Sequence, residues 1–355
     1  MLHQSAIPSP SAAARTERFV GDLNPEAVIR ERLDSSSAKS FRDRIGLWIS
    51  SREVRGDEDG SDRTLPAQVS GAVEQPYAGG QLSQQPVETI ASFMRQQYAA
   101  ALSSCERLPL TTRDRLLPIY FSRVDHILPL LDKDAFLSAY SDGTTSVFLE
   151  RAICVVAAKD PEAGPSLRLT IDGPILSSRQ FCSEVYKGLV VAMNAGLEPD
   201  RIASIRALAL MSLHCEGFEG AEAASMHLCQ AIHLAQTAGL HLNRPGRAPG
   251  DALSRLFWCL WTLDKMHASI GGRPVILADR DIGIEKPDIN TLTSRSAFDV
   301  WLSISDMLAT VISLYRPGAD HNVGWEDSFP TFEQIVGVNV RDDLDFMTLG
   351  AHLPS

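Results

Sequence analysis

Residues 253–287, LSRLFWCLWTLDKMHASIGGRPVILADRDIGIEKP, decide the fold class of this chain. The first half of the stretch carries large apolar side chains around most of a helix circumference, with Phe257, Trp258 and Trp261 the largest. A helix that is apolar nearly all round is surrounded by other elements of a large core. The stretch therefore predicts a central, buried helix around which the rest of the fold is arranged.

A sharp turn is predicted where this helix ends. Gly271 and Gly272 allow the chain to reverse, Pro274 fixes the exit, and Arg273 could hold a carboxylate or helix carbonyls in a bidentate fork. Asp264 lies within the apolar helix, where a buried carboxylate has to be paired or hydrogen-bonded. We expect a structural contact with Arg273 or with a backbone amide, because a catalytic acid would require a second carboxylate or a base nearby.

Further helical segments lie on both sides of this stretch. Apolar residues recur with helical spacing in residues 87–104, 147–160, 177–196, 202–218, 221–242 and 297–318. Asp132 and Ser177 are N-cap candidates, and Gly239 is a C-cap candidate. Pro118 and Pro129 predict short helices joined by turns between them. Because no strand alternation and no βαβ rhythm occur, the predicted fold class is all-α, an irregular multi-helix domain without a fixed repeat.

The composition divides the chain into three parts. Residues 1–86 are rich in Ser, Pro, Gly, Gln and charge, so we expect a largely disordered region or linker. Within it, apolar residues at helical spacing predict a short amphipathic helix near residues 41–50, either a transient helix that docks on the body or a partner-binding segment. Residues 87–320 form the predicted all-α domain, and residues 321–355 form an irregular C-terminal tail.

The bulk composition excludes several classes of protein. Of the 355 residues, 44% are hydrophobic and 22% are charged, and the formal net charge is −11. An acidic chain neutralises phosphates poorly, so we expect no specific DNA binding by this chain alone. Neither a membrane span nor a secretory signal is predicted. The six scattered cysteines form no C-x-x-C pair, which is typical of a reduced, intracellular protein.

No recognised catalytic motif is present. The sequence has no G-x-S-x-G, no phosphate-binding glycine loop and no H-E-x-x-H, so we do not expect an enzyme. Histidines and cysteines do gather in one region, at His214, Cys215, His227, Cys229, His233 and His241. Their spacing on a helix points neighbouring side chains to different sides, so we interpret them as ordinary helix and core residues and predict no metal site.

The stretch quoted first resembles the signature of the fungal specific transcription factor domain, the middle regulatory region of fungal zinc-binuclear-cluster transcription factors. The residues that carry the resemblance are Arg255, Phe257, Trp258, Asp264, Gly272, Arg273, Pro274 and Asp281. Residues 120–140 and 205–244 resemble two other blocks of the family, in the family's order, so that the similarity extends over about residues 115–320. The resemblance implies an all-α regulatory domain in which the signature residues are structural or regulatory.

The chain departs from the family pattern in its cysteines. Members usually carry six N-terminal cysteines, C-x2-C-x6-C repeated, which hold two zinc ions. The cysteines here do not fit that pattern: Cys105, Cys154, Cys182, Cys215, Cys229 and Cys259. We therefore expect no cofactor in this chain, and zinc only if a missing N-terminal cluster exists.

The resemblance also implies a function and partners. We expect a nuclear transcription regulator of a fungal metabolic or secondary-metabolite gene set, acting through its helical domain. The alternatives are a cluster-less co-regulator or a small-molecule sensor that works through a DNA-bound partner, and a helical enzyme. The expected partners are the transcription machinery or another DNA-bound regulator, a small-molecule effector, and a subunit of a homo- or heterodimer. DNA would be reached only indirectly or through a missing module, and no membrane is expected.

Overall fold

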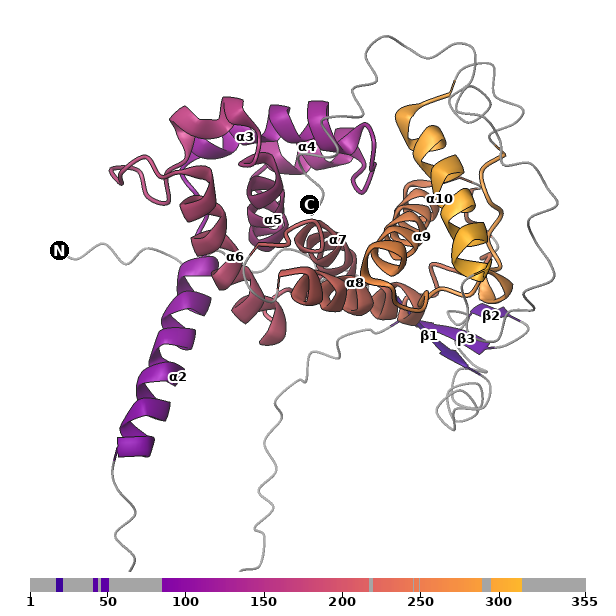
Figure 1. Ribbon diagram of the computed structural model, residues 1–355, viewed down its shortest axis with the longest axis horizontal. Helices are drawn as coiled ribbons and strands as arrows, with labels where there is room; N and C mark the ends of the chain where they lie inside the picture. Colours follow the sequence, from indigo (N-terminus) through magenta and orange to yellow (C-terminus); the bar gives the residue numbers. More distant parts are fainter. Residues whose placement is uncertain are drawn as a thin grey trace, which may run out of the picture.

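Helices α5 (Val147–Ala157) and α7 (Arg201–Met211) form the centre of the computed structural model, and α9 (Ala252–Gly271) lies towards one side of it (Figure 1). The structure describes residues 17–21, 41–43, 46–50, 85–216, 220–244, 246–248, 250–288 and 295–314. Helices α5 and α7 bury most of their side chains, and α9 buries the aromatic residues around its circumference. The prediction that this stretch forms a buried helix is therefore confirmed, and so is the all-α class of the body, but α5 and α7 occupy the centre that was predicted for α9.

The remaining helices surround this centre in an order close to that of the sequence. They are α2 (Gln85–Ser104), α3 (Leu110–Tyr120), α4 (Lys133–Ser141), α6 (Ser178–Asn194), α8 (Gly220–Thr237) and α10 (Ala297–Leu314). Helices α3 and α6 pack on α5, α7 packs between α5 and α8, and α9 packs between α8 and α10. Helix α2 packs on α6 and projects outward from the body (Figure 1).

Several helix ends follow the predicted capping. The Asp132 carboxylate accepts a hydrogen bond of 3.2 Å from the amide of Ala135 at the start of α4. Ser177 forms a capping box with Gln180 at the start of α6. Gly239 has a φ of +69° just beyond α8, a backbone conformation in which glycine is not strained.

The chain continues through Pro118 with helical turns, which differs from the predicted break. Pro118 lies inside α3, and a short π-helix, η2 (Phe121–Asp125), follows directly. Proline removes one backbone hydrogen bond from α3, but the amide of Phe121 still donates to the carbonyl of Leu117, so the helical path continues into η2. The predicted break does occur at Pro129, which lies between η2 and α4.

A buried ionic cluster fixes the start of the body. The Glu150 side chain on α5 is 2% exposed and forms ion pairs with Arg107 and, at 3.0 Å, with Arg113. The neighbouring Arg151 donates to the carbonyls of Ser103 (2.6 Å) and Glu106 (2.9 Å), just where α2 ends. Because a buried carboxylate needs such partners, the cluster holds the C-terminal end of α2 against α5.

A small antiparallel sheet replaces the amphipathic helix that the sequence predicted near residues 41–50. Its strands are β1 (Glu17–Gly21), β2 (Phe41–Asp43) and β3 (Gly46–Ser50), in the order β1–β3–β2, and β1 runs beside α8. A helix of that length would be marginal and would contain Gly46, whereas pairing with β1 satisfies the backbone of β3. The prediction of a helix there was wrong, and the expectation of a largely disordered region overlooked the strands.

Other sequence predictions lie outside the described residues. These include the rest of residues 1–86, the tail at 321–355 and the predicted helix end at residues 317–318. All six cysteines are free thiols, three of them buried. Among the described helices, none combines the length and the hydropathy that crossing a bilayer requires.

Candidate functional site

The signature residues lie on α9 and on the stretch that follows it, residues 273–288, which we call the return segment. At the start of α9, Asp251 accepts a hydrogen bond of 2.7 Å from the amide of Ser254. At the end, Gly272 has a φ of +60°, and the amides of Gly272 and Arg273 both donate to the carbonyl of Ala268. This left-handed turn sends the return segment back along the helix.

Asp264 joins the return segment to α9. Its carboxylate is 2% exposed and accepts hydrogen bonds from the amides of Ile276 (3.0 and 3.1 Å) and Leu277 (2.9 Å). Burial raises the pKa of Asp264, and the two amide hydrogen bonds oppose that rise. Of the two predicted partners, the structure selects the backbone amides. Both oxygens already accept hydrogen bonds, so the carboxylate is engaged in holding the fold.

Lys265 makes the reciprocal contact. Its ammonium donates to the carbonyl of Leu277 at 2.9 Å and lies 3.5 Å from Asp279 and 3.8 Å from Asp264. It also lies over the ring of Trp261, 4.9 Å from the centroid. The residue is 2% exposed, so these neighbours replace the water that the charge loses. Adjacent residues of α9 therefore bind both the amide and the carbonyl of Leu277.

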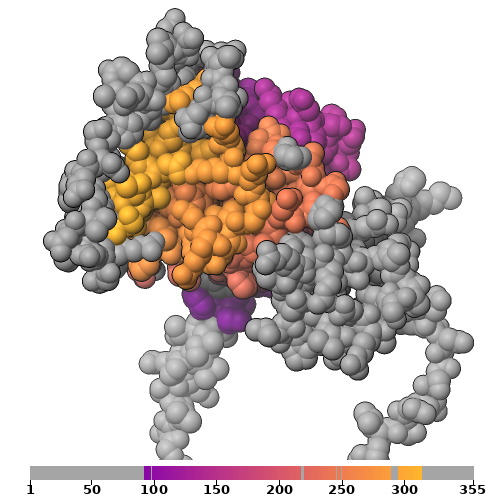
Figure 2. Space-filling model, turned by 90° about the vertical axis from the view of Figure 1, so that its right-hand side faces the viewer, coloured from indigo at the N-terminus to yellow at the C-terminus, as the bar shows by residue number. Residues whose placement is uncertain are grey.

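The indoles of α9 extend this arrangement to α10. Trp258 Nε1 donates to the carbonyl of Glu285 at 3.2 Å, and Trp261 Nε1 donates to Asp279 at 2.7 Å. The ammonium of Lys286 lies 4.3 Å from the centroid of Trp261 and forms an ion pair with Asp306 on α10. Figure 2 shows α9, the return segment and α10, in orange to yellow, together making up much of this face of the molecule.

The remaining signature residues do not converge on a common point. Phe257 packs edge to face on Trp258, with ring centroids 5.8 Å apart. Arg255 and Asp281 are exposed. Pro274 is exposed at the exit of the turn, as its predicted role requires.

Arg273 does not form the fork that we expected. Its side chain is exposed, and no hydrogen bond or ion pair of its guanidinium occurs within the described part of the chain. Its main-chain amide makes the structural contact instead, in the helix cap.

Two contributors to this arrangement escaped the sequence analysis, namely Lys286 and Asp306. Lys286 follows the pair of indoles by more than twenty positions, and Asp306 lies on another helix, so no local spacing connects them. The signal that could have indicated them is chemical. Two tryptophans one helical turn apart form an electron-rich surface that attracts a cation.

The histidines and cysteines of residues 214–241 are spread over separate surroundings. Tyr186 hydrogen-bonds to His227 Nε2 at 2.7 Å, and its ring lies 4.4 Å from that of His214. Burial lowers the pKa of His214 to about 4 and also lowers that of His227, so both imidazoles are neutral at pH 7. Within the described ranges, no three His, Cys, Asp or Glu side chains are grouped so that they could hold a metal ion.

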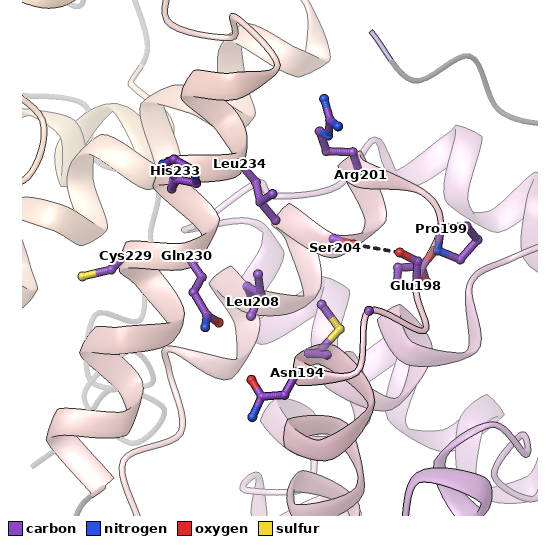
Figure 3. A pocket seen from close by; sticks show the side chains of 12 residues that line it. Asn194, Glu198, Pro199, Arg201, Ser204, Leu208, Cys229, Gln230, His233 and Leu234 are labelled. Carbon is purple, nitrogen blue, oxygen red and sulfur yellow. Dashed lines mark hydrogen bonds between the residues drawn. The ribbon is translucent and has the colours of Figure 1, made fainter. Parts of the chain in front are cut away.

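A second feature is an open cleft of about 700 Å³ between the end of α6, the start of α7 and α8, which we call the α6–α8 cleft (Figure 3). Its lining combines apolar Met193, Leu208 and Leu234 with polar Asn194, Gln230 and His233. Its volume lies within the range typical of small-molecule sites. The sequence analysis singled out two of the lining residues, Cys229 and His233, without predicting a cleft.

The charged groups of the α6–α8 cleft are Glu198 and Arg201. The Glu198 carboxylate accepts hydrogen bonds from the hydroxyl of Ser146 and, at 2.9 Å, from the amide of Asp200. Burial raises the pKa of Glu198, and these hydrogen bonds oppose the rise. The carboxylate is thus engaged in fixing the turn between α6 and α7. An apolar floor with an amide-rich rim can bind a small amphipathic molecule, but it contains no pair of groups arranged for catalysis.

Similarity to known proteins covers half of the chain or more. A family model described as fungal specific transcription factor domain matches residues 117–333. The chain is 26% identical over 190 residues to cutinase transcription factor 1 alpha of Fusarium vanettenii, a similarity that covers 52% of this chain and 20% of that protein. It is 25% identical over 209 residues to cutinase transcription factor 1 beta of the same organism, covering 56% and 23%.

A third relative comes from another fungus. The chain is 22% identical over 195 residues to transcriptional activator protein acu-15 of Neurospora crassa, covering 50% of this chain and 19% of that protein. These matches span about a fifth of the length of the curated relatives. No solved structure matches the chain significantly.

Proposed function

Because this chain belongs to the family of fungal specific transcription factor domains, we propose that it is the regulatory body of a nuclear transcription regulator of a metabolic or secondary-metabolite gene set. The observation that carries the proposal is the extent of the family match. Residues 117–333 include α5, α7 and α9 with its return segment, which together contribute much of the hydrophobic core. The family and the relatives found are transcription factors and not enzymes.

The buried polar contacts of α9 support a regulatory role in which the domain acts by presenting a fixed surface. Asp264, Lys265 and the indoles of α9 direct their polar atoms at the return segment and at α10, so they stabilise a surface without exposing a reactive group. Partners would therefore be bound by the surface that these contacts hold in place. We infer that those partners are the transcription machinery or another DNA-bound regulator. A chain of net charge −11 is poorly suited to hold DNA itself.

A reporter assay tests the proposal. The full chain is fused to a heterologous DNA-binding module in yeast, and the transcription of a reporter gene is compared with that given by the module alone. We expect the fusion to raise or lower reporter transcription, and Asp264→Ala to weaken that effect. Asp281→Ala, an exposed signature residue, should leave it intact when both variants accumulate equally. Reporter output equal to that of the module alone would refute a direct role in transcription.

The gene set requires its own measurement. Deleting the gene from its host and quantifying transcripts should change a group of genes that encode enzymes of one metabolic route. Unchanged metabolic transcripts in the deletion strain would contradict this part of the proposal.

The α6–α8 cleft favours a second candidate, a sensor of a small amphipathic molecule that works through a DNA-bound partner. Gln230 lines the cleft and is exposed, so Gln230→Trp adds bulk to the cleft from its surface side. Met226 lies on the same helix, is 55% exposed and does not line the cleft, so Met226→Trp is the matched control. We expect Gln230→Trp alone to change how reporter output responds to the carbon source. Equal responses of the two variants would argue against a sensor.

A further inference from the structure

Arg273 is a signature residue whose side chain makes no polar contact that would explain its position. It is exposed on the turn after α9, and among the residues that the structure describes its guanidinium has no hydrogen-bond or ion-pair partner. The nearby helix end offers no open acceptor at Ala268, because that carbonyl already accepts the amides of Gly272 and Arg273. The guanidinium carries five N–H donors in a planar fork, so this fork remains available to an acceptor from outside the body.

The Arg273 side chain lies where the end of α9 meets α8. Its Cγ, Cδ and Nε lie 3.5 Å from the position that a Cβ of Gly271 would take. Burial raises the pKa of the Cys229 thiol on α8, and the charge of Arg273 opposes that rise. Burial also lowers the pKa of His267 on α9, to which the charge of Arg273 contributes. The guanidinium is therefore within electrostatic reach of both helices, which pack on each other (Figure 1).

Exposed apolar side chains flank this arginine on both sides in the sequence. Ile270 is 60% exposed, Ile276 is 42% exposed, and Pro274 between them is exposed as well. We call these three residues and Arg273 the turn surface. Its backbone is fixed by the left-handed cap at one end and by the bond of 3.0 Å from the Ile276 amide to Asp264 at the other. A surface that is already ordered loses little entropy when it binds a partner.

Acidic residues are absent from the two chain segments that meet at the turn surface. Residues 223–250, which include most of α8, and residues 265–278 contain no Asp or Glu. Asp264, just before the second segment, is 2% exposed and bound by backbone amides. Asp279, just after it, accepts a hydrogen bond of 2.7 Å from the indole of Trp261. A carboxylate that approaches Arg273 along these segments therefore meets a cation without like charge beside it.

We propose that the turn surface binds an acidic segment of a partner protein, with a carboxylate in the fork of Arg273 and large apolar side chains on Ile270 and Ile276. The charge around the turn favours this occupant, because a bidentate pair with a carboxylate satisfies the planar fork. Arginine is also enriched at protein interfaces and is among the residues that carry most of their binding energy. The inference rests on the proposed function only in that the partner belongs to the transcription machinery or is a DNA-bound regulator.

Fluorescence anisotropy with the purified full chain tests the binding directly. The probe is a labelled synthetic helical peptide with aspartates on one side and leucine and phenylalanine on the other. We expect Arg273→Ala to raise its dissociation constant at least about tenfold, and Arg273→Lys to restore part of the affinity, because lysine keeps the charge without the fork. Arg280→Ala removes the same charge from a side chain of the return segment that is 88% exposed, and should bind like the wild type.

A second pair of variants tests the apolar part of the turn surface. Ile270→Ser should weaken binding of the aspartate peptide severalfold, whereas Ile171→Ser, at an isoleucine that is 81% exposed in the loop before α6, should leave it unchanged. Equal thermal unfolding checks that the exposed substitutions leave the fold intact. An aspartate peptide that does not bind, or that Arg273→Ala and Arg280→Ala weaken equally, would overturn the proposal.

Other occupants of the turn surface give distinguishable results. A DNA duplex that binds in place of the peptide and is lost in Arg273→Ala would assign the fork to phosphate. A dimer seen by analytical ultracentrifugation and lost in the same variant, without peptide binding, would make a second copy the occupant. Either result would overturn the acidic segment.

The reporter fusion described above separates this inference from the proposed function. We expect Arg273→Glu, which reverses the charge, to reduce the effect of the fusion on transcription, and Arg280→Glu to leave it unchanged. An active fusion that Arg273→Glu does not alter would overturn the turn surface and leave the regulatory role standing. An inactive wild-type fusion would refute the regulatory role, while peptide binding would still be read by anisotropy.

Discussion

Asp264→Ala removes the carboxylate that binds the return segment to α9. The two amides it serves differ in their surroundings. Ile276 is 42% exposed, so water can replace the lost acceptor, whereas Leu277 is 2% exposed and its amide would remain buried without a partner. Lys265 would keep Asp279 at 3.5 Å and the carbonyl of Leu277 at 2.9 Å. The change therefore acts mainly through one orphaned donor.

The loss in the free energy of unfolding caused by Asp264→Ala is the difference between two opposing contributions. An unsatisfied buried amide costs about 1–3 kcal/mol, and each hydrogen bond to a charged acceptor contributes about 1.5–3 kcal/mol. Removing the carboxylate also relieves its desolvation, the same burial that raises the pKa of Asp264. We expect a net loss of about 2 kcal/mol in the free energy of unfolding. In a body of this size that corresponds to a drop of about 4–8 °C in Tm.

Two further variants make the assay specific. Asp264→Asn keeps one acceptor, so we expect about half the loss in thermal and urea unfolding followed by circular dichroism. Asp281 belongs to the same signature, but its side chain is 69% exposed and faces Arg280 at 3.9 Å. Asp281→Ala should change stability by less than about 0.5 kcal/mol. If Asp264→Ala and Asp281→Ala unfold alike, the carboxylate does not hold the return segment and our reasoning fails.

Three other predictions concern the same folded body. Gly272→Ala should destabilise by about 1 kcal/mol because of its φ of +60°, whereas Gly271→Ala should be neutral or stabilising in thermal unfolding; equal losses would contradict the left-handed cap. Burial raises the pKa of Asp125 from its usual 3.8 to about 6, so its ionised form costs stability. Asp125→Asn should therefore stabilise by up to about 3 kcal/mol above pH 6, a gain that disappears near pH 4; a gain independent of pH would exclude this cause. Burial lowers the pKa of His214 from 6.5 to about 4, so its contribution to stability is lost as pH falls through that interval. His214→Gln should make Tm depend less steeply on pH between about 6.5 and 4. An unchanged slope would mean that other groups cause the pH dependence.

Local chemistry was predicted well from the sequence. Asp132 and Ser177 cap their helices, and Gly239 and Gly272 adopt the left-handed conformation after theirs. Each of these features depends on a few neighbouring residues, which a sequence displays directly. The hydrogen-bond donor for Asp264 was likewise limited to two predicted alternatives, Arg273 or a backbone amide, because a carboxylate inside an apolar helix needs a donor and has few within reach.

The features that were missed depend on residues distant in sequence. The sheet forms because β3 pairs with β1, about thirty positions earlier, and this outweighed the helical spacing of residues 41–50. Lys286 and Asp306 meet because α10 packs on α9. The α6–α8 cleft is likewise a gap among three helices, and no single segment indicates it. Pairing and docking of this kind override local preference.

Because the helices differ in how many neighbours they pack against, the free energy needed for local unfolding should differ between α10 and the central helices. Helices α5 and α7 have neighbours on several sides, whereas α10 packs chiefly on α9 and is joined to the return segment by the ion pair of Lys286 with Asp306. An element held from one side can detach without disturbing the rest, at a fraction of the global unfolding free energy. Amide protons of α10 should therefore exchange with solvent when α10 alone detaches, whereas those of α5 and α7 should exchange only when the whole molecule unfolds.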